Sequence, residues 1–306
     1  MNQLEAKLCL FSITFFTGIQ YIFLTDIEAS TSRFAYLTVT SLIGFLIVFA
    51  AFCGELFRIN KRQVFQSFLL AIEMFLFNIC LLLGSSDMNP AVVSFAMTGY
   101  LIFIPVIYIL MKKKLSKTTI LGTVVVMFGL ALALELSPSG LADFRLFFLL
   151  AADVFFALYI VTVEYVSIKS NPSILAMGRM FFSFLFALIG WIAETAITGQ
   201  DMTLPSDTSF WSSVMFISIF VGGFYCVIQI YAQRYVSAMD AALIFSTETV
   251  ITLLMAPLIL AFAGETHEPI TTYKLVGCVV IIVGVLIADG SVLATLRQHK
   301  KVPNEK

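Results

Sequence analysis

The chain has 306 residues, of which 60% are apolar and only 12% are charged, and its net charge is −1 at pH 7. Soluble globular proteins carry about 45–50% apolar and about 25% charged residues, so the composition excludes an ordinary soluble domain and indicates a polytopic membrane protein. No basic stripe with interleaved aromatic residues is present, so nucleic-acid binding has no support.

Ten apolar stretches follow one another along the chain, joined by short connections. A spanning helix needs about 20 mainly apolar residues, and each stretch is close to that length. The sequence therefore predicts an all-α membrane protein with ten transmembrane helices. The predicted spans are residues 6–24, 33–54, 63–84, 90–111, 118–136, 144–166, 172–196, 210–232, 239–263 and 272–293.

Lys and Arg residues are distributed unevenly between the two sets of alternating span ends. Of the 18 in the chain, 14 fall at one set of ends, 3 at the opposite ends, and Arg179 lies within a span. Because Lys and Arg accumulate in cytoplasmic connections, this distribution predicts that the N and C termini are both cytoplasmic.

The two halves of the chain resemble each other. Gly122 and Gly129 are seven positions apart in the fifth stretch, and Gly277 and Gly284 repeat that spacing in the tenth. Such glycines lie on one helix face and permit close helix packing. Since each half has five spans, the second is expected to be inverted, as in secondary transporters. We predict two five-helix repeats, residues 1–138 and 139–293, and a basic cytoplasmic tail, residues 294–306.

Several motifs are similar to those of the EamA-type families in the drug/metabolite transporter superfamily. The resemblance rests on the segment Tyr231–Ser237, on residues 241–248, on Ala157-Leu158-Tyr159, on the stretch from Thr98 to Pro105, and on Glu265. It implies ten helices in two inverted repeats, a central cavity, and movement of small solutes by alternating access. Many relatives have Pro after the glutamate of the ninth span, where this chain has Thr249.

Four ionisable residues fall near the middle of predicted spans: Glu73, Asp153, Arg179 and Glu248. A charged group at the centre of a bilayer costs about 2.5–3.5 kcal/mol on insertion scales, so such residues are functional candidates. We assign all four to proton coupling or to a charge pair, and the two glutamates also to solute binding. Glu164, near the end of its span, is expected to be solvated or interfacial.

Each of these residues also has a purely structural interpretation. Glu248 can be tied to a nearby amide or hydroxyl, for example at Thr249 or Thr252. Arg179 can pair with Asp153 on the preceding span, or it can bind a carboxylate or phosphate of the solute, which suits its planar fork.

Uncharged polar residues complete the predicted solute site. Each alone is more often a helix–helix contact than a ligand, but together they suggest a wet cavity. Tyr225 and Gln229, four positions apart, are expected on one helix face. The remaining candidates are Gln20, Asn78, Thr98, Tyr100 and Tyr159.

The leading hypothesis is a secondary carrier that moves a small organic solute, such as an amino acid or related metabolite, out across the plasma membrane. Its expected partners are the solute, the lipid bilayer and protons as the candidate coupling ion. No nucleotide-binding motif or metal-ligand spacing is present, so no cofactor, no metal site and no enzymatic activity are expected. The alternatives are a lipid or lipid-phosphate flippase and, less favoured, an intramembrane enzyme.

Overall fold

The computed structural model describes residues 1–25, 31–86, 88–133, 144–199, 201–263 and 271–288. These ranges contain helices and turns without a β-strand, which confirms the predicted all-α class. The predicted tail, residues 294–306, and Glu265 lie outside the described residues.

The first half of the chain forms α1 to α6. Polar caps fix two of the helix starts: Ser32 Oγ accepts the Ala35 amide at 3.1 Å, and Asn60 Oδ1 accepts the Gln63 amide at 2.9 Å. The elements are α1 (Gln3–Thr25), α2 (Arg33–Phe52), the 3-10 segment η1 (Cys53–Arg58), α3 (Lys61–Ser85), α4 (Pro90–Ala96), α5 (Tyr100–Leu110) and α6 (Lys117–Ala133).

The second half begins with α7. Asn171 followed by Pro172 starts α8, just as Asn89 followed by Pro90 starts α4, because Asn caps the helix and Pro fits its first turn. The elements are α7 (Arg145–Ser167), α8 (Pro172–Thr198), α9 (Thr208–Phe216), the π-helical segment η3 (Ile217–Tyr225), α10 (Cys226–Ala232), α11 (Ala238–Phe245), α12 (Thr247–Ala263) and α13 (Thr272–Ala288).

Helix length and composition support a multi-pass membrane protein. Within the described residues, eight helical stretches are long and apolar enough to cross a bilayer. The other two predicted spans correspond to α6 and α13, which are apolar but have 17 residues each. The count of ten spans therefore stays a prediction.

The fourth and ninth predicted spans are each broken in the middle. Residues 97–99 separate α4 from α5, and Ser246 separates α11 from α12. Thr98, which the sequence placed inside a continuous helix, lies in the first break. Its hydroxyl donates to the Phe95 carbonyl at 2.5 Å, a local bond of the kind that competes with the helix ladder.

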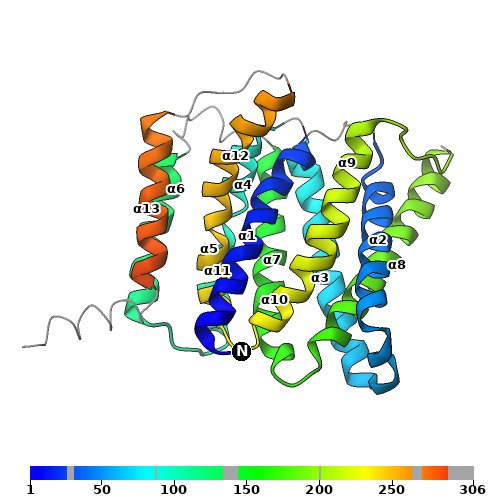
Figure 1. The fold of residues 1–306 in the computed structure, drawn as a ribbon, viewed down its shortest axis with the longest axis horizontal. Coiled ribbons are helices and arrows are strands. Elements are labelled where there is room, and N and C mark those ends of the chain that lie inside the picture. Colours follow the sequence, from blue (N-terminus) through cyan, green and yellow to red (C-terminus); the bar gives the residue numbers. More distant parts are fainter. Residues whose placement is uncertain (26–30, 87, 134–143, 200, 264–270, 289–306) are drawn as a thin grey trace, which may run out of the picture.

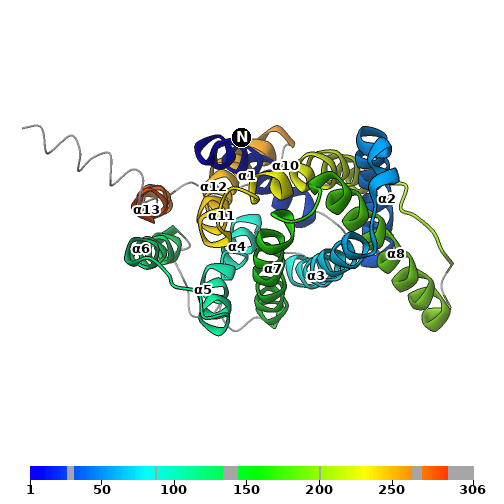
Figure 2. The same cartoon turned by 90° about the horizontal axis from the view of Figure 1, so that it is seen from below.

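The α6–α13 pair lies at one edge of the bundle, and α2 and α8 lie at the opposite edge (Figure 2). The repeated glycines hold α6 against α13. A Cβ atom at Gly122 would lie 2.6 Å from the Gly284 carbonyl oxygen, and one at Gly129 would lie 3.0 Å from the Gly277 carbonyl oxygen. The predicted close packing at these glycines is therefore confirmed, since no side chain fits between the two backbones.

One end of the bundle collects the connections rich in Lys and Arg. In Figure 1 the N-terminus and the α2–α3, α5–α6, α7–α8 and α10–α11 connections all lie at the lower end. We call this end, defined by these segments, the basic end. The same view shows α1 running away from the basic end and α7 running toward it.

Candidate functional site

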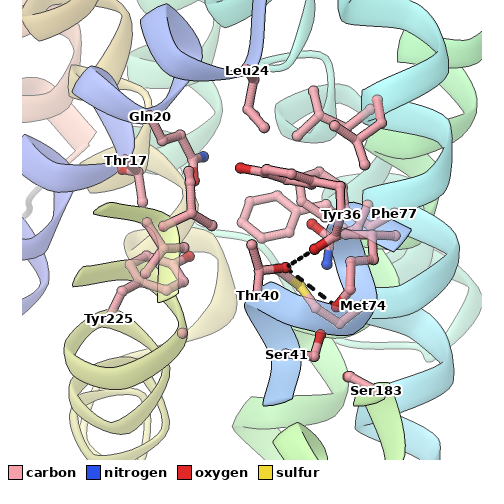
Figure 3. A pocket seen from close by; sticks show the side chains of 18 of the residues that line it. Thr17, Gln20, Leu24, Tyr36, Thr40, Ser41, Met74, Phe77, Ser183 and Tyr225 are labelled. Carbon is pink, nitrogen blue, oxygen red and sulfur yellow. Dashed lines mark hydrogen bonds between the residues drawn. The ribbon is translucent and has the colours of Figure 1, made fainter. Parts of the chain in front are cut away.

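A central cavity of about 70 Å³ lies among α1, α2, α3, α7, α8, η3 and α12. Figure 3 shows Thr17 and Gln20 of α1 and Tyr225 of η3 on one side, with Tyr36 and Thr40 of α2 on the other. The lining residues of α1, α2 and α3 belong to the helix halves remote from the basic end. They are Thr17, Gln20, Tyr21, Leu24, Tyr36, Leu37, Thr40, Ser41, Met74, Phe77, Asn78, Leu81 and Leu82.

The cavity has room for a few water molecules but not for an organic solute. A single water needs about 10–15 Å³ of such space, so several waters fit. Pockets that enclose drug-sized ligands measure about 300–1,000 Å³. The cavity must therefore widen before an organic solute enters, and the flexible side chains of Met74, Met97 and Met180 in its wall can yield to allow this.

Three of the predicted polar residues face this cavity with unused hydrogen-bonding capacity. Gln20, Asn78 and Tyr225 line it, and their side chains make no hydrogen bond to another residue in the described part of the chain. Amides and a phenol in this state are available to a solute or to water.

Arg179 of α8 also lines the cavity and is only 3% exposed. Its Nε donates to Cys226 Sγ at 3.1 Å, and one terminal nitrogen donates to Met180 Sδ at 3.2 Å. Its Cζ lies 5.6 Å from the centroid of the Tyr159 ring, which adds a cation–π contact. Sulfur is a weak acceptor, and the salt bridges among the described residues do not include Arg179, so its charge remains available.

Glu248 brings the opposite charge to the same cavity. It is 4% exposed and lies in the first turn of α12, where the helix dipole favours a carboxylate. Tyr21 of α1 donates its hydroxyl to Glu248 Oε1 at 3.1 Å. The hydroxyls that the sequence suggested do not bind the Glu248 carboxylate. Thr249 donates to Ser94 O, and Thr252 donates to Gly18 O and to the backbone carbonyl of Glu248.

Other candidate residues lie outside the cavity wall. Tyr159 donates to Gln229 Oε1 at 3.2 Å, and Tyr100 donates to the Ala242 carbonyl at 3.4 Å; all three side chains are fully buried. Tyr225 lines the cavity but Gln229, predicted on the same face, does not, and its amide oxygen is occupied by the Tyr159 hydroxyl. Thr98 is likewise absent from the lining.

Glu73 sits between α3 and α7 rather than in the cavity. Its Oε1 accepts the Thr162 hydroxyl at 2.8 Å, while its buried Oε2 has no hydrogen-bond partner in the described structure.

Asp153 does not form the suggested ion pair with Arg179. Both of its carboxylate oxygens are buried without a hydrogen-bond partner among the described residues, and a Cβ atom at Gly99 would lie 3.0 Å from its Cγ. Asp153 thus faces the α4–α5 break, whereas Arg179 faces α10. Neighbouring helices in the chain do not guarantee neighbouring side chains.

Several lining residues were not predicted from the sequence, above all Tyr21, the partner of Glu248. A signal was present, because Thr17, Gln20, Tyr21 and Leu24 recur at the spacing of one helix face.

The basic end below the cavity is closed by a cluster around Glu164. Its carboxylate accepts hydrogen bonds from Tyr108 Oη at 2.5 Å, Lys113 Nζ at 2.7 Å and the Ala238 amide at 3.1 Å. Burial alone would lower the pKa of Lys113. Its hydrogen bond to Glu164 and its other contacts raise the pKa by more than burial lowers it, so the pKa lies above its usual value. The cluster ties the ends of α5 and α7 to the start of α11. Glu164 lies near the end of its span, as predicted, and its side chain is partly buried there, at 16% exposed.

The chain was compared with known proteins. Residues 144–288 match the model of the EamA-like transporter family, which confirms the resemblance seen in the sequence. A search of curated proteins finds no match. Among 29 matching chains of solved structures, one crystal structure aligns with a TM-score of 0.68 and 14% sequence identity, over 96% of this chain and 98% of that chain. This second likeness concerns the fold alone.

Proposed function

We propose that the protein is a secondary transporter for a small zwitterionic solute. The match of residues 144–288 to the model of the EamA-like transporter family supports a transporter. The favoured solute is an amino acid with an apolar side chain, exported across the cell membrane by alternating access.

One observation carries the choice of solute. Arg179 and Glu248 line the same cavity and are not joined by an ion pair. A guanidinium fork binds a carboxylate in two places, and a carboxylate binds an ammonium group, so the two residues suit the two charges of an amino acid. The remaining wall includes Met74, Phe77 and Phe156, which suit an apolar side chain.

The repeat architecture supports the transporter assignment. We take residues 1–138 and 139–293 as inverted repeats that contribute ten spans. The fourth and ninth spans are both broken, and the helix that follows each break, α5 and α12, contains an internal proline, Pro105 and Pro257 respectively. Paired broken helices in the two halves typically flank the substrate site of secondary transporters.

The closed basic end supports alternating access. Two amide atoms between the cavity and this end, Gln229 Nε2 and Gln233 Oε1, are buried without a hydrogen-bond partner in the described structure. Buried polar groups are normally satisfied, so these two atoms would gain water if the basic end opened. We assign the basic end to the cytoplasm by its Lys and Arg content, which makes the observed conformation closed on the cytoplasmic side.

Proton coupling is proposed at Glu248. When the solute leaves, the carboxylate loses its ammonium partner in a poorly hydrated site, and a proton from water takes that place on an oxygen of Glu248. The incoming ammonium group then displaces this proton. Glu73 and Asp153, buried with unpartnered oxygens, are further proposed proton carriers.

Transport by purified protein in liposomes tests the proposal. Radiolabelled L-leucine and L-methionine are the probes, with an imposed pH gradient as the driving force. We expect saturable flux that Glu248→Gln uncouples from the gradient. Flux of neither amino acid, or flux of both by Glu248→Gln with unchanged dependence on the gradient, would reject the solute class or the coupling residue, respectively.

A further inference from the structure

A second cavity lies at the basic end, apart from the central one. It measures about 330 Å³ and is formed by α2, η1, α3 and α8. No residue lines both cavities. The lining residues are Phe45, Phe49, Leu56, Ile59, Val64, Ser67, Ile174, Met177, Gly178, Phe181 and Phe182.

The chemistry of this wall excludes a polar solute. Ser67 is its one polar side chain, and its hydroxyl donates to the Ile174 carbonyl at 3.5 Å. No lining side chain carries a charge, so the cavity suits a hydrocarbon chain.

The mouth of the cavity lies on the outer surface of the bundle. Val64 at the rim is 42% exposed, and Phe181 is 39% exposed. The adjoining Phe57 of η1 is 96% exposed. A phenyl ring that is almost fully exposed at the end of a membrane bundle is expected at the lipid interface.

Three cations stand beside this rim. Arg58 ends η1, and Lys61 and Arg62 begin α3; all three are exposed. Glu55 offsets part of this charge, since it lies 3.5 Å from Arg58 and also accepts a hydrogen bond from Asn171 at 3.0 Å. A net positive charge therefore remains beside the rim. A phospholipid with an acyl chain in the cavity would place its headgroup phosphate there.

We propose that this site binds one anionic phospholipid, with an acyl chain in the cavity and the headgroup phosphate on Arg58, Lys61 and Arg62. The apolar wall selects a lipid over a soluble anion, and the cations select an anionic headgroup over a zwitterionic one. Basic clusters beside membrane helices attract anionic lipids in this way. The proposal does not depend on the transported solute.

Native mass spectrometry of the full chain, titrated with phosphatidylglycerol or phosphatidylcholine of equal chain length, tests this site. We expect the wild type to prefer phosphatidylglycerol by about tenfold or more. The triple variant Arg58→Gln, Lys61→Gln, Arg62→Gln should lose this preference. The matched control Lys112→Gln, Lys114→Gln, Lys117→Gln removes three cations at the same end, away from the cavity, and should keep it.

A separate variant tests the acyl-chain cavity. Val64→Trp, at an exposed rim position, should fill the cavity and weaken binding of both lipids. Equal loss of preference in the triple variant and its control, unchanged lipid binding by Val64→Trp, or full displacement of the lipid by inorganic phosphate would each overturn the proposal. Unchanged melting temperatures in phosphatidylcholine show that the variants are folded.

Discussion

Replacing Arg179 with Gln should abolish recognition of the solute carboxylate while leaving recognition of its ammonium group intact. Arg179 is 3% exposed, and its hydrogen-bond acceptors among the described residues are sulfur atoms, so its attraction for a carboxylate is not already neutralised. Losing one partner of a buried charge pair costs about 2–5 kcal/mol. Because the cavity admits water, we take the lower part of that range, about 2–3 kcal/mol, which is about 30- to 150-fold in Kd.

The assay is a cycle that pairs the substitution with a change in the ligand. L-leucine is compared with isoamylamine, which lacks the carboxylate, by thermal shift and calorimetry on wild type and Arg179→Gln. In the wild type the amine should bind about 30- to 150-fold more weakly than leucine. In the variant the two ligands should bind alike. A mirror-image cycle uses Glu248→Gln with isocaproate, which lacks the amine.

A cycle of this kind cancels the effect of any general damage to the fold, because such damage weakens the binding of both ligands by the same factor. If Arg179→Gln weakens leucine and isoamylamine by the same factor, the coupling energy is zero. Arg179 would then hold α8 against α10 through Cys226, without binding the solute.

Three further substitutions test other parts of the structure. Glu164→Gln should loosen the closed basic end, so that Cys226, kept as the sole cysteine, reacts several-fold faster with maleimide added from that side; an unchanged rate would show that the cluster does not close it. Gly99→Ala should lower stability by about 1–3 kcal/mol through overlap with the buried Asp153 carboxylate, whereas Gly54→Ala, with no atom within 4 Å of the new Cβ, should be neutral in the same unfolding assay. Gly284→Leu should separate α13 from α6 and lower the melting temperature by several degrees; an unchanged value would place the stability of the bundle elsewhere.

The transmembrane segments could be predicted because a bilayer imposes one simple requirement, a long apolar run. The rotation of each helix about its own axis could not be predicted from the sequence. A helix that is apolar on every face carries no periodic pattern to show which face meets which neighbour. That is why a pair between Asp153 and Arg179, on consecutive spans, was one of two interpretations, although Asp153 faces Gly99 instead.

The same reason separates the cavity-lining residues that were predicted from those that were missed. Arg179 and Glu248 could be found by depth alone, since any charge in mid-membrane is conspicuous. The residue spacing in α1 places Tyr21 on the same helix face as Gln20. It does not show that this face meets Glu248, because that depends on a contact between α1 and α12 that joins residues 227 positions apart in the sequence. Aromatic residues are common in this chain, so an additional tyrosine in the first span attracts no attention.

Arg179 and Glu248 pose a physical question that the transport proposal answers. Two buried charges of opposite sign would lower their energy by pairing directly, and a buried charge left without its partner costs several kcal/mol. In this cavity each is held apart from the other by its own neighbours, Arg179 by Cys226 and Met180 and Glu248 by Tyr21. An arrangement that only stabilised the fold would close the gap between them. The separation is explained if a ligand with both charges binds between Arg179 and Glu248. The favourable electrostatic energy of the two new charge pairs is then released on ligand binding, and it drives the change of conformation.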